Sequence, residues 1–331
     1  MKRRDFITLA GGAAIAWPLV ARAQQSAMPI IGLLNNTTFE LRRSEITAFH
    51  RGLEEFGYVQ GHNIAIQYRW AEGRYDRLPL LAADLVRAGV SLLVATGGEP
   101  VALAAQAAVK SAASAIPIVF IVAGDPVAIG LVDSLNRPGG NATGVSLLAT
   151  QLEMKRLQIA QELIPNAEAL AFLANPNNPI TESATREMQL AAATLGQRLF
   201  VLKASTRAEI DAAFLEFAGR RVGGVLPQGD GFLFGQRDQI ISLAAQHAIP
   251  GIYSQREFVT AGGLMSYGSS ITDGYRQIGT YAARILKGER PSDLPIQQST
   301  KVDLVINLKT AKTLGLNIPL SLLGRANEVI E

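Results

Sequence analysis

Short apolar runs alternate with longer amphipathic segments along most of the chain. The apolar runs predict strands at 30–34, 64–69, 92–96, 117–122, 169–174, 264–267 and 302–307. Between them, apolar residues at helical spacing predict helices at 42–56, 75–88, 101–111, 151–163, 271–287 and 308–314. This alternation is typical of parallel sheets with helices on both faces, so the pattern predicts an α/β fold.

The pattern starts again near the middle of the chain. Asn35 and Asn36 follow the first strand, and Asn175 follows the strand at 169–174. A glycine turn opens a helix in each half, at 97–98 and at 229–231, and Ile-Pro precedes the next strand in both. This internal repeat is loose, and coincidence is the alternative. The repeat nevertheless favours two similar open sheets, that is, two Rossmann-like lobes.

The carboxyl-terminal segments are predicted to cross between these lobes. We predict a first lobe from 28–145 and 268–295, and a second lobe from 146–267 and 296–331. Residues 290–295 indicate an extended connection. Several crossings would form a hinge of parallel strands, which would let the lobes close on a ligand held at the facing strand ends.

The first 23 residues have a different character from the rest. Arg3 and Arg4 precede an apolar run at 7–20, which is followed by the small-x-small sequence Ala21-Arg22-Ala23. The run is too short and too glycine-rich to span a bilayer as a stable helix, so the segment predicts a cleaved signal peptide. The twin arginines favour the route that exports folded proteins, and a general secretory signal is the alternative.

The charge and the absence of cysteine exclude several kinds of partner, metal site and membrane anchor. The leader contains four basic residues and one acidic residue, which accounts for the whole formal charge of +3. The remaining chain is about neutral, which removes the electrostatic argument for a nucleic-acid or anionic-membrane partner. The absence of cysteine excludes disulfides, thiolate metal sites and a lipid-anchored cysteine. We therefore expect an unanchored protein of the periplasm, with full secretion as the alternative.

Candidate ligand contacts follow the predicted strands. At Thr96, Gly97 and Gly98, backbone N–H groups at a helix start would hold a carboxylate or phosphate, although a simple tight turn is the alternative. Asp125 would either accept a ligand N–H or cap the following segment. Tyrosines after later strands would pack on an apolar ligand or serve as structural packing. The predicted contacts are Asn35, Asn36, Thr96, Gly97, Gly98, Asp125, Asn175, Asp230, Tyr253 and Tyr267.

Signals for catalysis are weak. His50, His62 and His247 have no metal-like spacing, no GxSxG sequence occurs, and no acidic pair stands out. We predict no catalytic residue, no metal and no cofactor.

Several sequence strings resemble one protein family. They include 124–127 (GDPV), 137–141 (RPGGN), 261–268 (AGGLMSYG), 285–288 (ILKG) and 305–311 (VINLKTA). The resemblance covers essentially all of 28–331, and it is to the substrate-binding family of ABC transporters that includes tryptophan-binding proteins. It implies a type I periplasmic binding protein, a monomer that closes on a small solute and delivers it to an ABC permease in the inner membrane.

The resemblance is imperfect at the glycine turn. Relatives that hold the carboxylate of an aromatic amino acid there have Thr-Pro directly after glycine, whereas this chain has Gly98-Glu99. A carboxylate pointing inward would oppose a ligand carboxylate. The ligand of those relatives therefore does not carry over to this chain. The resemblance implies a small solute, such as an amino acid or an aromatic or organic acid. An exported enzyme or a ligand-sensing receptor domain on the same fold are the alternatives.

Overall fold

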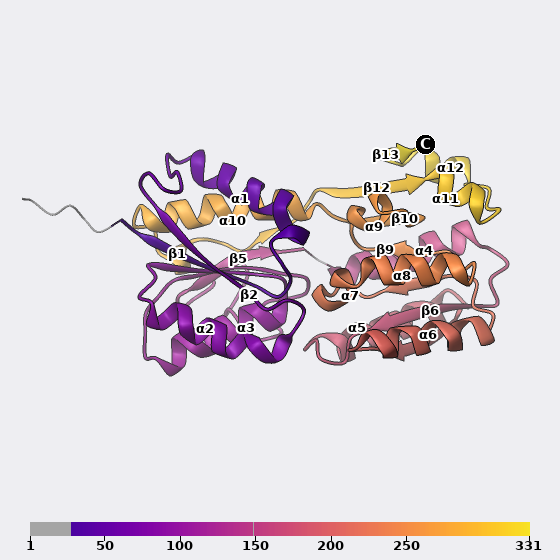
Figure 1. The fold of residues 1–331 in the computed structure, drawn as a ribbon, viewed down its shortest axis with the longest axis horizontal. Coiled ribbons are helices and arrows are strands. Elements are labelled where there is room, and N and C mark those ends of the chain that lie inside the picture. Colours follow the sequence, from indigo (N-terminus) through magenta and orange to yellow (C-terminus); the bar gives the residue numbers. More distant parts are fainter. Residues whose placement is uncertain (1–27, 148) are drawn as a thin grey trace, which may run out of the picture.

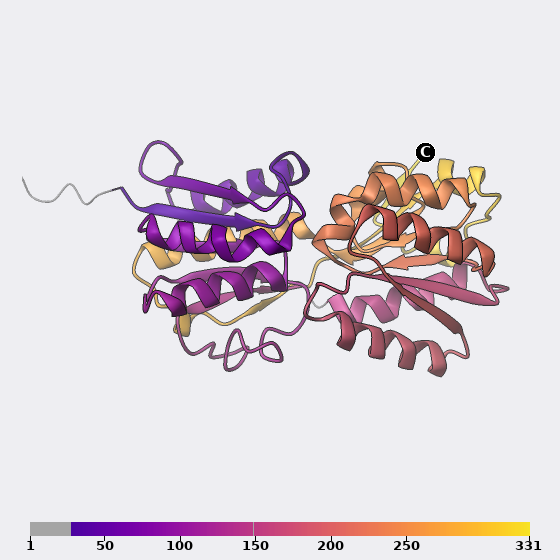
Figure 2. The same cartoon turned by 60° about the horizontal axis from the view of Figure 1, so that its bottom comes forward.

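The computed structural model describes residues 28–147 and 149–331, so the predicted signal peptide lies outside the described residues. Two α/β lobes lie side by side, each built around a sheet with helices on its faces (Figures 1 and 2). The two-lobed architecture predicted by the alternating pattern is confirmed.

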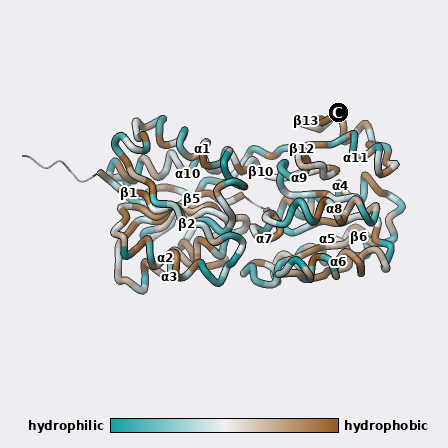
Figure 3. Tube along the Cα trace, viewed as in Figure 1, coloured by the Kyte–Doolittle hydropathy of each residue, from teal (hydrophilic) through white to brown (hydrophobic). Residues whose placement is uncertain are grey.

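The first lobe contains a six-stranded parallel sheet in the order β11-β5-β4-β3-β1-β2. Its strands are β1 (Ile30–Asn35), β2 (Ala65–Trp70), β3 (Leu92–Thr96), β4 (Ile118–Val122), β5 (Ala142–Ser146) and β11 (Gln297–Gln298). The central strands β1, β3 and β4 are almost wholly buried and apolar, as expected for parallel strands covered on both faces (Figure 3).

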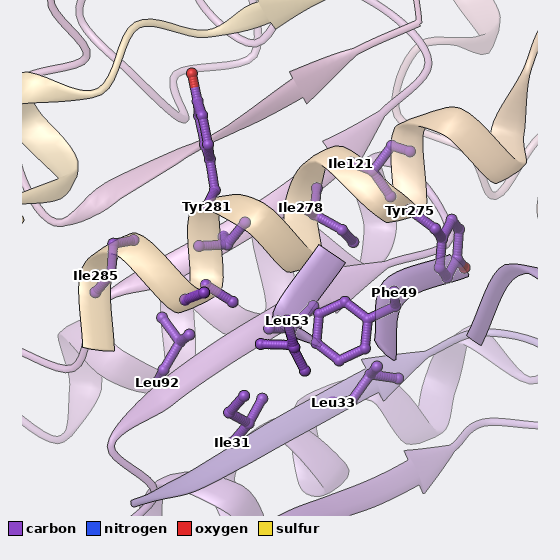
Figure 4. Close-up of a cluster of buried hydrophobic side chains, with 14 of the residues drawn as sticks. Ile31, Leu33, Phe49, Leu53, Leu92, Ile121, Tyr275, Ile278, Tyr281 and Ile285 are labelled. Carbon is purple, nitrogen blue, oxygen red and sulfur yellow. The ribbon is translucent and has the colours of Figure 1, made fainter. Parts of the chain in front are cut away.

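Alternate residues of these strands face two separate apolar clusters. Ile31 and Leu33 pack under α1 (Arg43–Glu54) and α10 (Ile271–Leu286), as Figure 4 shows. Leu34 and Leu93 face the opposite cluster, which includes side chains of α2 (Leu78–Arg87) and α3 (Glu99–Ser111). The period-2 alternation of the strands thus supplies both halves of the core.

Helices α1 and α10 approach each other so closely that glycine is required at their contact. A Cβ on Gly52 would lie 2.1 Å from the Arg276 carbonyl oxygen, and one on Gly279 would lie 2.2 Å from the Phe49 carbonyl oxygen. This contact brings α10, which comes late in the sequence, onto the first lobe.

The second lobe has two small sheets joined edge to edge. The parallel sheet β7-β6-β8 contains β6 (Ala169–Ala174), β7 (Arg198–Lys203) and β8 (Val225–Pro227). The sheet β13-β12-β10-β9 contains β9 (Ile252–Tyr253), β10 (Met265–Ser269), β12 (Val302–Asn307) and β13 (Glu328–Ile330). A parallel bridge between Val225 and Gly251 connects β8 to the start of β9.

The remaining helices of the second lobe cover the faces of these sheets. They are α4 (Ala149–Leu163), α5 (Thr181–Thr194), α6 (Arg207–Gly219), α7 (Gly231–Gly235), α8 (Arg237–Gln246), α9 (Arg256–Thr260), α11 (Leu308–Thr313) and α12 (Leu320–Leu323). Short 3₁₀ turns η1 (Glu40–Arg42), η2 (Tyr75–Arg77) and η3 (Pro291–Asp293) lie in the first lobe.

The order of strands repeats between the lobes. The succession β2-β1-β3-β4-β5 in the first lobe corresponds to β7-β6-β8-β9-β10 in the second. The two halves of the sequence, each with asparagine after its first strand, therefore fold into lobes with the same strand order. In both lobes, the chain reverses its direction of strand addition beside the first strand, where open α/β sheets bind ligands.

The chain crosses between the lobes three times, and the crossings are hydrogen-bonded to one another. Ser299 N–H donates to the Ser146 carbonyl at 2.9 Å, Ser269 Oγ donates to the Leu147 carbonyl at 2.7 Å, and Ser270 N–H donates to the Lys301 carbonyl at 2.9 Å. The predicted multi-strand hinge is present, but its strands β10 and β12 are antiparallel because the chain enters the first lobe along one and leaves it along the other.

Two details of the predicted connections differ. Residues 290–295 contain the 3₁₀ turn η3 instead of being extended throughout. Strand β11 pairs with β5, which places Gln297 and Gln298 in the first-lobe sheet, beyond the predicted boundary at 295.

Candidate functional site

A pocket between the lobes lies at the carboxyl ends of their strands. It encloses ≈ 430 Å³ of empty space, part of it open to solvent. Both lobes and the hinge line it, through Arg42, Gly97, Gly98, Ile121, Val122, Ala123, Leu147, Gly229, Asp230, Gly231, Gln255, Ile271 and Tyr275.

The glycine turn after β3 forms part of the first-lobe wall. Gly97 and Gly98 have φ of +111° and +94°, which L side chains rarely adopt. The predicted contacts Gly97 and Gly98 line the pocket, whereas Thr96 is fully buried behind them.

The side chain of Glu99 accepts hydrogen bonds from the backbone of the loop that follows β4. Its Oε1 accepts the N–H groups of Ala123 at 2.9 Å and Gly124 at 2.7 Å. Burial raises the pKa of Glu99, and the nearby Asp230 carboxylate raises it further. The added carboxylate noted in the sequence is therefore turned into the protein, at the loop that follows β4.

Asn35 organises the first-lobe wall from within. Its side-chain amide donates to Thr96 Oγ1 at 2.8 Å and to the Tyr275 hydroxyl at 2.9 Å. Its Oδ1 accepts from the Thr37 N–H at 2.7 Å. Asn35 is fully buried and does not line the pocket, so it positions Tyr275, which does.

Asp230 lines the second-lobe wall, and its carboxylate accepts hydrogen bonds from four donors. Oδ1 accepts from Asn175 and from the Leu233 N–H, both at 3.0 Å, and the latter bond caps α7. Oδ2 accepts from Asn178 at 3.0 Å and from the Tyr75 hydroxyl at 2.8 Å. Asn175 therefore holds Asp230. It does not line this pocket, but it lines a second hollow between the lobes, together with Tyr75 of the first lobe.

Tyr75 and Asn36 connect the lobes directly. The Tyr75 hydroxyl donates to Asp230 and accepts the Phe232 N–H at 3.2 Å, so one first-lobe side chain engages the start of α7. Burial and then the Asp230 carboxylate hold the pKa of Tyr75 well above its usual value. A Cβ on Gly231 would lie 1.9 Å from Asn36 Nδ2, which shows how tightly Asn36 approaches the second lobe.

Arg42 lines the pocket, and the sequence did not single it out. It is 4% exposed, and its Nη1 donates to Glu45 at 2.8 Å and to Gln255 of the second lobe at 3.2 Å. Its guanidinium lies 4.0 Å from the centre of the Phe234 ring. At the start of an amphipathic helix, nothing in the sequence distinguishes a buried arginine from a solvated one.

Three predicted contacts lie away from the pocket. Asp125 is exposed and accepts the Val127 N–H at 2.8 Å, so it supports the local turn. Tyr253 is 1% exposed and stacks on Phe258 at 4.4 Å within the second-lobe core. Tyr267 packs against another apolar cluster of that lobe. In this conformation both tyrosines pack inside the second lobe, because the pleat directs them toward its covered faces.

Two further features bear on the class of site. Within 28–147 and 149–331, no group of three or more histidine, aspartate or glutamate residues could hold a metal ion. Over the same described residues, no helix combines the length and the apolar character needed to cross a bilayer.

Comparison with known proteins shows similarity over nearly the whole chain. The family model described as ABC transporter substrate binding protein matches residues 30–330. A tyrosine-binding protein of Clostridioides difficile (strain R20291) is 26% identical over 269 residues, which span 81% of this chain and 75% of that protein.

Solved structures share the two-lobed fold. A conserved domain protein from Vibrio cholerae has a TM-score of 0.84 and 27% identity, over 91% of this chain and 99% of that one. An ABC domain in complex with L-Trp from Streptococcus pneumonia has a TM-score of 0.80 and 25% identity, over 91% of this chain and 100% of that one.

Proposed function

The chain belongs to the ABC transporter substrate-binding protein family, and from that premise we propose that it binds a small amino-acid-like solute between its lobes. The protein is a substrate-binding protein of an ABC transporter with a type I periplasmic-binding-protein fold. Its partner in that role is the permease of the transporter.

The observation that carries the proposal is the interlobe pocket lined by both lobes at their equivalent strand ends. Apolar groups (Ile121, Val122 and Leu147) accompany polar ones (Arg42 and Asp230) in its lining. A ligand that contacts both walls stabilises the closed arrangement by its differential contacts, which is how a binding protein reports its state to a permease. The relatives named for tyrosine and solved with L-Trp support an amino-acid ligand.

The pocket offers little for the alternative of an exported enzyme. Asp230 is the carboxylate of the lining, and its two oxygens accept four hydrogen bonds from the protein, which leaves it poorly placed as a general base. A sensing role uses the same pocket and would be distinguished by the absence of permease and ATPase genes beside this one.

The binding proposal is tested by calorimetry and thermal unfolding of the mature protein with the twenty L-amino acids. We expect at least one to raise Tm and to give a saturable heat of binding. If none binds and the protein instead converts an added metabolite chemically, the proposal is wrong.

We also propose that the protein reaches the periplasm through its twin-arginine signal, with cleavage after Ala23. In a Gram-negative host, replacement of Arg3 and Arg4 by lysine should leave the precursor in the cytoplasm. Amino-terminal sequencing of the periplasmic wild-type protein identifies the cleavage site. Unchanged export of the double variant would favour the general secretory route.

A further inference from the structure

The second hollow between the lobes is separate from the pocket described above, which we now call the inner pocket. The first lobe lines this outer hollow through residues 73–76, and the second lobe lines it through Asn175, Asn177, Ser205 and Phe232. The outer hollow encloses ≈ 830 Å³ of empty space and the inner pocket ≈ 430 Å³, both partly open to solvent. Among the described residues, none lines both spaces, so the cleft has two compartments.

Tyr75 and Asn36 form a partition between the two compartments. The Tyr75 hydroxyl donates to Asp230 of the inner pocket at 2.8 Å, and it accepts the N–H of Phe232, which lines the outer hollow, at 3.2 Å. Asn36 Nδ2 donates to the carbonyl of the inner-pocket residue Gly97 at 2.8 Å and to the Tyr75 hydroxyl at 3.4 Å. Each of these two side chains therefore contacts residues of both compartments.

The ring of Tyr75 closes this boundary together with its hydroxyl. The half-buried ring packs against the first-lobe apolar cluster that contains Ala71 and Leu78, and against the second-lobe cluster that contains Phe232. Because the ring contacts both lobes, its bulk would stay between them even if the hydroxyl were removed. The barrier between the compartments is therefore steric as well as polar.

The loop that carries Tyr75 is tied to the first lobe. The Gly73 N–H donates to the Asn36 carbonyl at 2.6 Å, and the Glu72 N–H donates to the Thr37 carbonyl at 3.1 Å. Glu72 and Gly73 have φ of +57° and +80°, so the chain turns sharply just before η2. These bonds lie within one lobe, so they hold the backbone beside Tyr75 in place before the lobes close.

We propose that Tyr75 is a specificity-determining residue that limits the length of the solute. This inference rests on the proposed function and adds a size limit to it. A solute confined to the inner pocket lets the partition form. A solute that extends toward the outer hollow takes the place of the Tyr75 ring and holds the lobes apart, so it gains less from closure.

The outer hollow becomes a subsite when the ring is removed. Its lining offers the polar side chains of Asn177 and Ser205, and also the Arg74–Asp76 ion pair, whose side chains are 65% and 67% exposed. An exposed pair of this kind is held weakly and can exchange partners with a ligand. The extension that fits is therefore polar and carries hydrogen-bonding groups, as the second residue of a dipeptide does.

Calorimetry on the mature protein tests the length limit. The probes are each L-amino acid that binds and the two dipeptides made by adding glycine to its amino or carboxyl end. Wild-type protein should bind the single amino acid at least about tenfold more tightly than either dipeptide. Equal or tighter binding of a dipeptide would overturn the inference and leave the proposed function intact. If none of the twenty amino acids binds, the proposed function fails, and this inference fails with it.

Substitutions at Tyr75 separate the bulk of the ring from its hydrogen bonds. Tyr75→Ala joins the compartments and should bind at least one dipeptide about tenfold more tightly than wild type does. Tyr75→Phe keeps the ring and should show no such gain. Tyr68→Ala is the control, since it removes a ring of the same lobe whose hydroxyl contacts His50 and Gln60, away from both compartments.

A gain of dipeptide affinity distinguishes a size limit from a merely structural role, because general destabilisation weakens the binding of every ligand. A Tyr75→Ala variant that retains a cooperative thermal transition but shows no gain would contradict the inference, and so would an equal gain in Tyr75→Phe. If Tyr75→Ala does not fold, Tyr75→Leu supplies a smaller apolar side chain for the same comparison.

Discussion

The two lobes build the same topological position in different ways. In the first lobe, Asn35 at the end of β1 donates to Thr96 at the end of β3 and to Tyr275, which packs on the same lobe. In the second lobe, Asn175 after β6 donates to Asp230, which follows β8. Asp230 also accepts from Tyr75, which belongs to the opposite lobe.

The first wall finds all the hydrogen-bond partners of Asn35 within its own lobe. The second wall gains one partner from the opposite lobe when the lobes close. The first-lobe network is neutral, and every partner of Asn35 lies in its own lobe. The second-lobe network is centred on a carboxylate and includes a donor that is present when the lobes are closed. We infer that the first wall is preorganised and that the second senses closure.

The largest expected effect is that of Asp230→Ala. It removes the cap of α7 and leaves Asn175, Asn178 and Tyr75 without their acceptor. We expect the free energy of unfolding to fall by about 2–4 kcal/mol and ligand binding to be lost. Urea denaturation and calorimetry measure both, with Asp238→Ala as the control because that side chain is 79% exposed. A stability close to wild type would show that the carboxylate does not organise this wall.

Asn35→Ala tests the preorganised wall. Loss of the side chain removes the amide donor shared by Thr96 and Tyr275, at a cost of about 1–3 kcal/mol in the free energy of unfolding. The separation of the lobes should not change, because no partner lies across the cleft. Small-angle scattering of the ligand-free variant checks this, and a larger radius of gyration than wild type would refute the distinction between the two walls.

Tyr75→Phe tests the interlobe link and should have a smaller effect on stability, of about 1 kcal/mol. It deletes the hydroxyl that joins Asp230 and the Phe232 N–H while keeping the ring. We expect weaker ligand binding and a more open ligand-free protein by scattering. Tyr68→Phe is the control, since the Tyr68 hydroxyl contacts His50 and Gln60 away from the pocket. Identical behaviour of the two variants would exclude a role for the link in closure.

The smallest effect concerns pH. Because the pKa of Glu99 is raised in the folded protein above its ordinary value of 4.5, the folded state binds more protons just above that pH than the unfolded state does. Stability is then lost as pH rises from 4.5 through the raised value. Glu99→Gln should therefore be more stable than wild type at pH 7.5 and similar at pH 4.5. Urea titrations at both values test this, and a variant that is less stable at pH 7.5 would reverse the sign.

Much of the fold follows from local pattern. Strand positions such as 92–96 and 169–174 coincide with β3 and β6, because buried parallel strands leave uninterrupted apolar runs. The glycine turns at 97–98 and 229–231 were predicted as helix starts from local sequence, and in the structure both line the pocket. Tyr253 was not predictable in this way, because its direction depends on which face of the sheet is covered.

The sequence by itself determined two α/β lobes, a balance of basic and acidic residues after the first 23 positions, and the backbone segments that border the cleft. Periodicity, turn residues and charge are properties of neighbouring residues, so they can be evaluated without a structure. Tertiary structure alone decided that Asn35 and Asn175 hold other side chains, that Glu99 turns inward, and that Arg42 and Tyr75 reach the second lobe. Those contacts join residues far apart in the chain, and their geometry is set by how the two lobes pack and close.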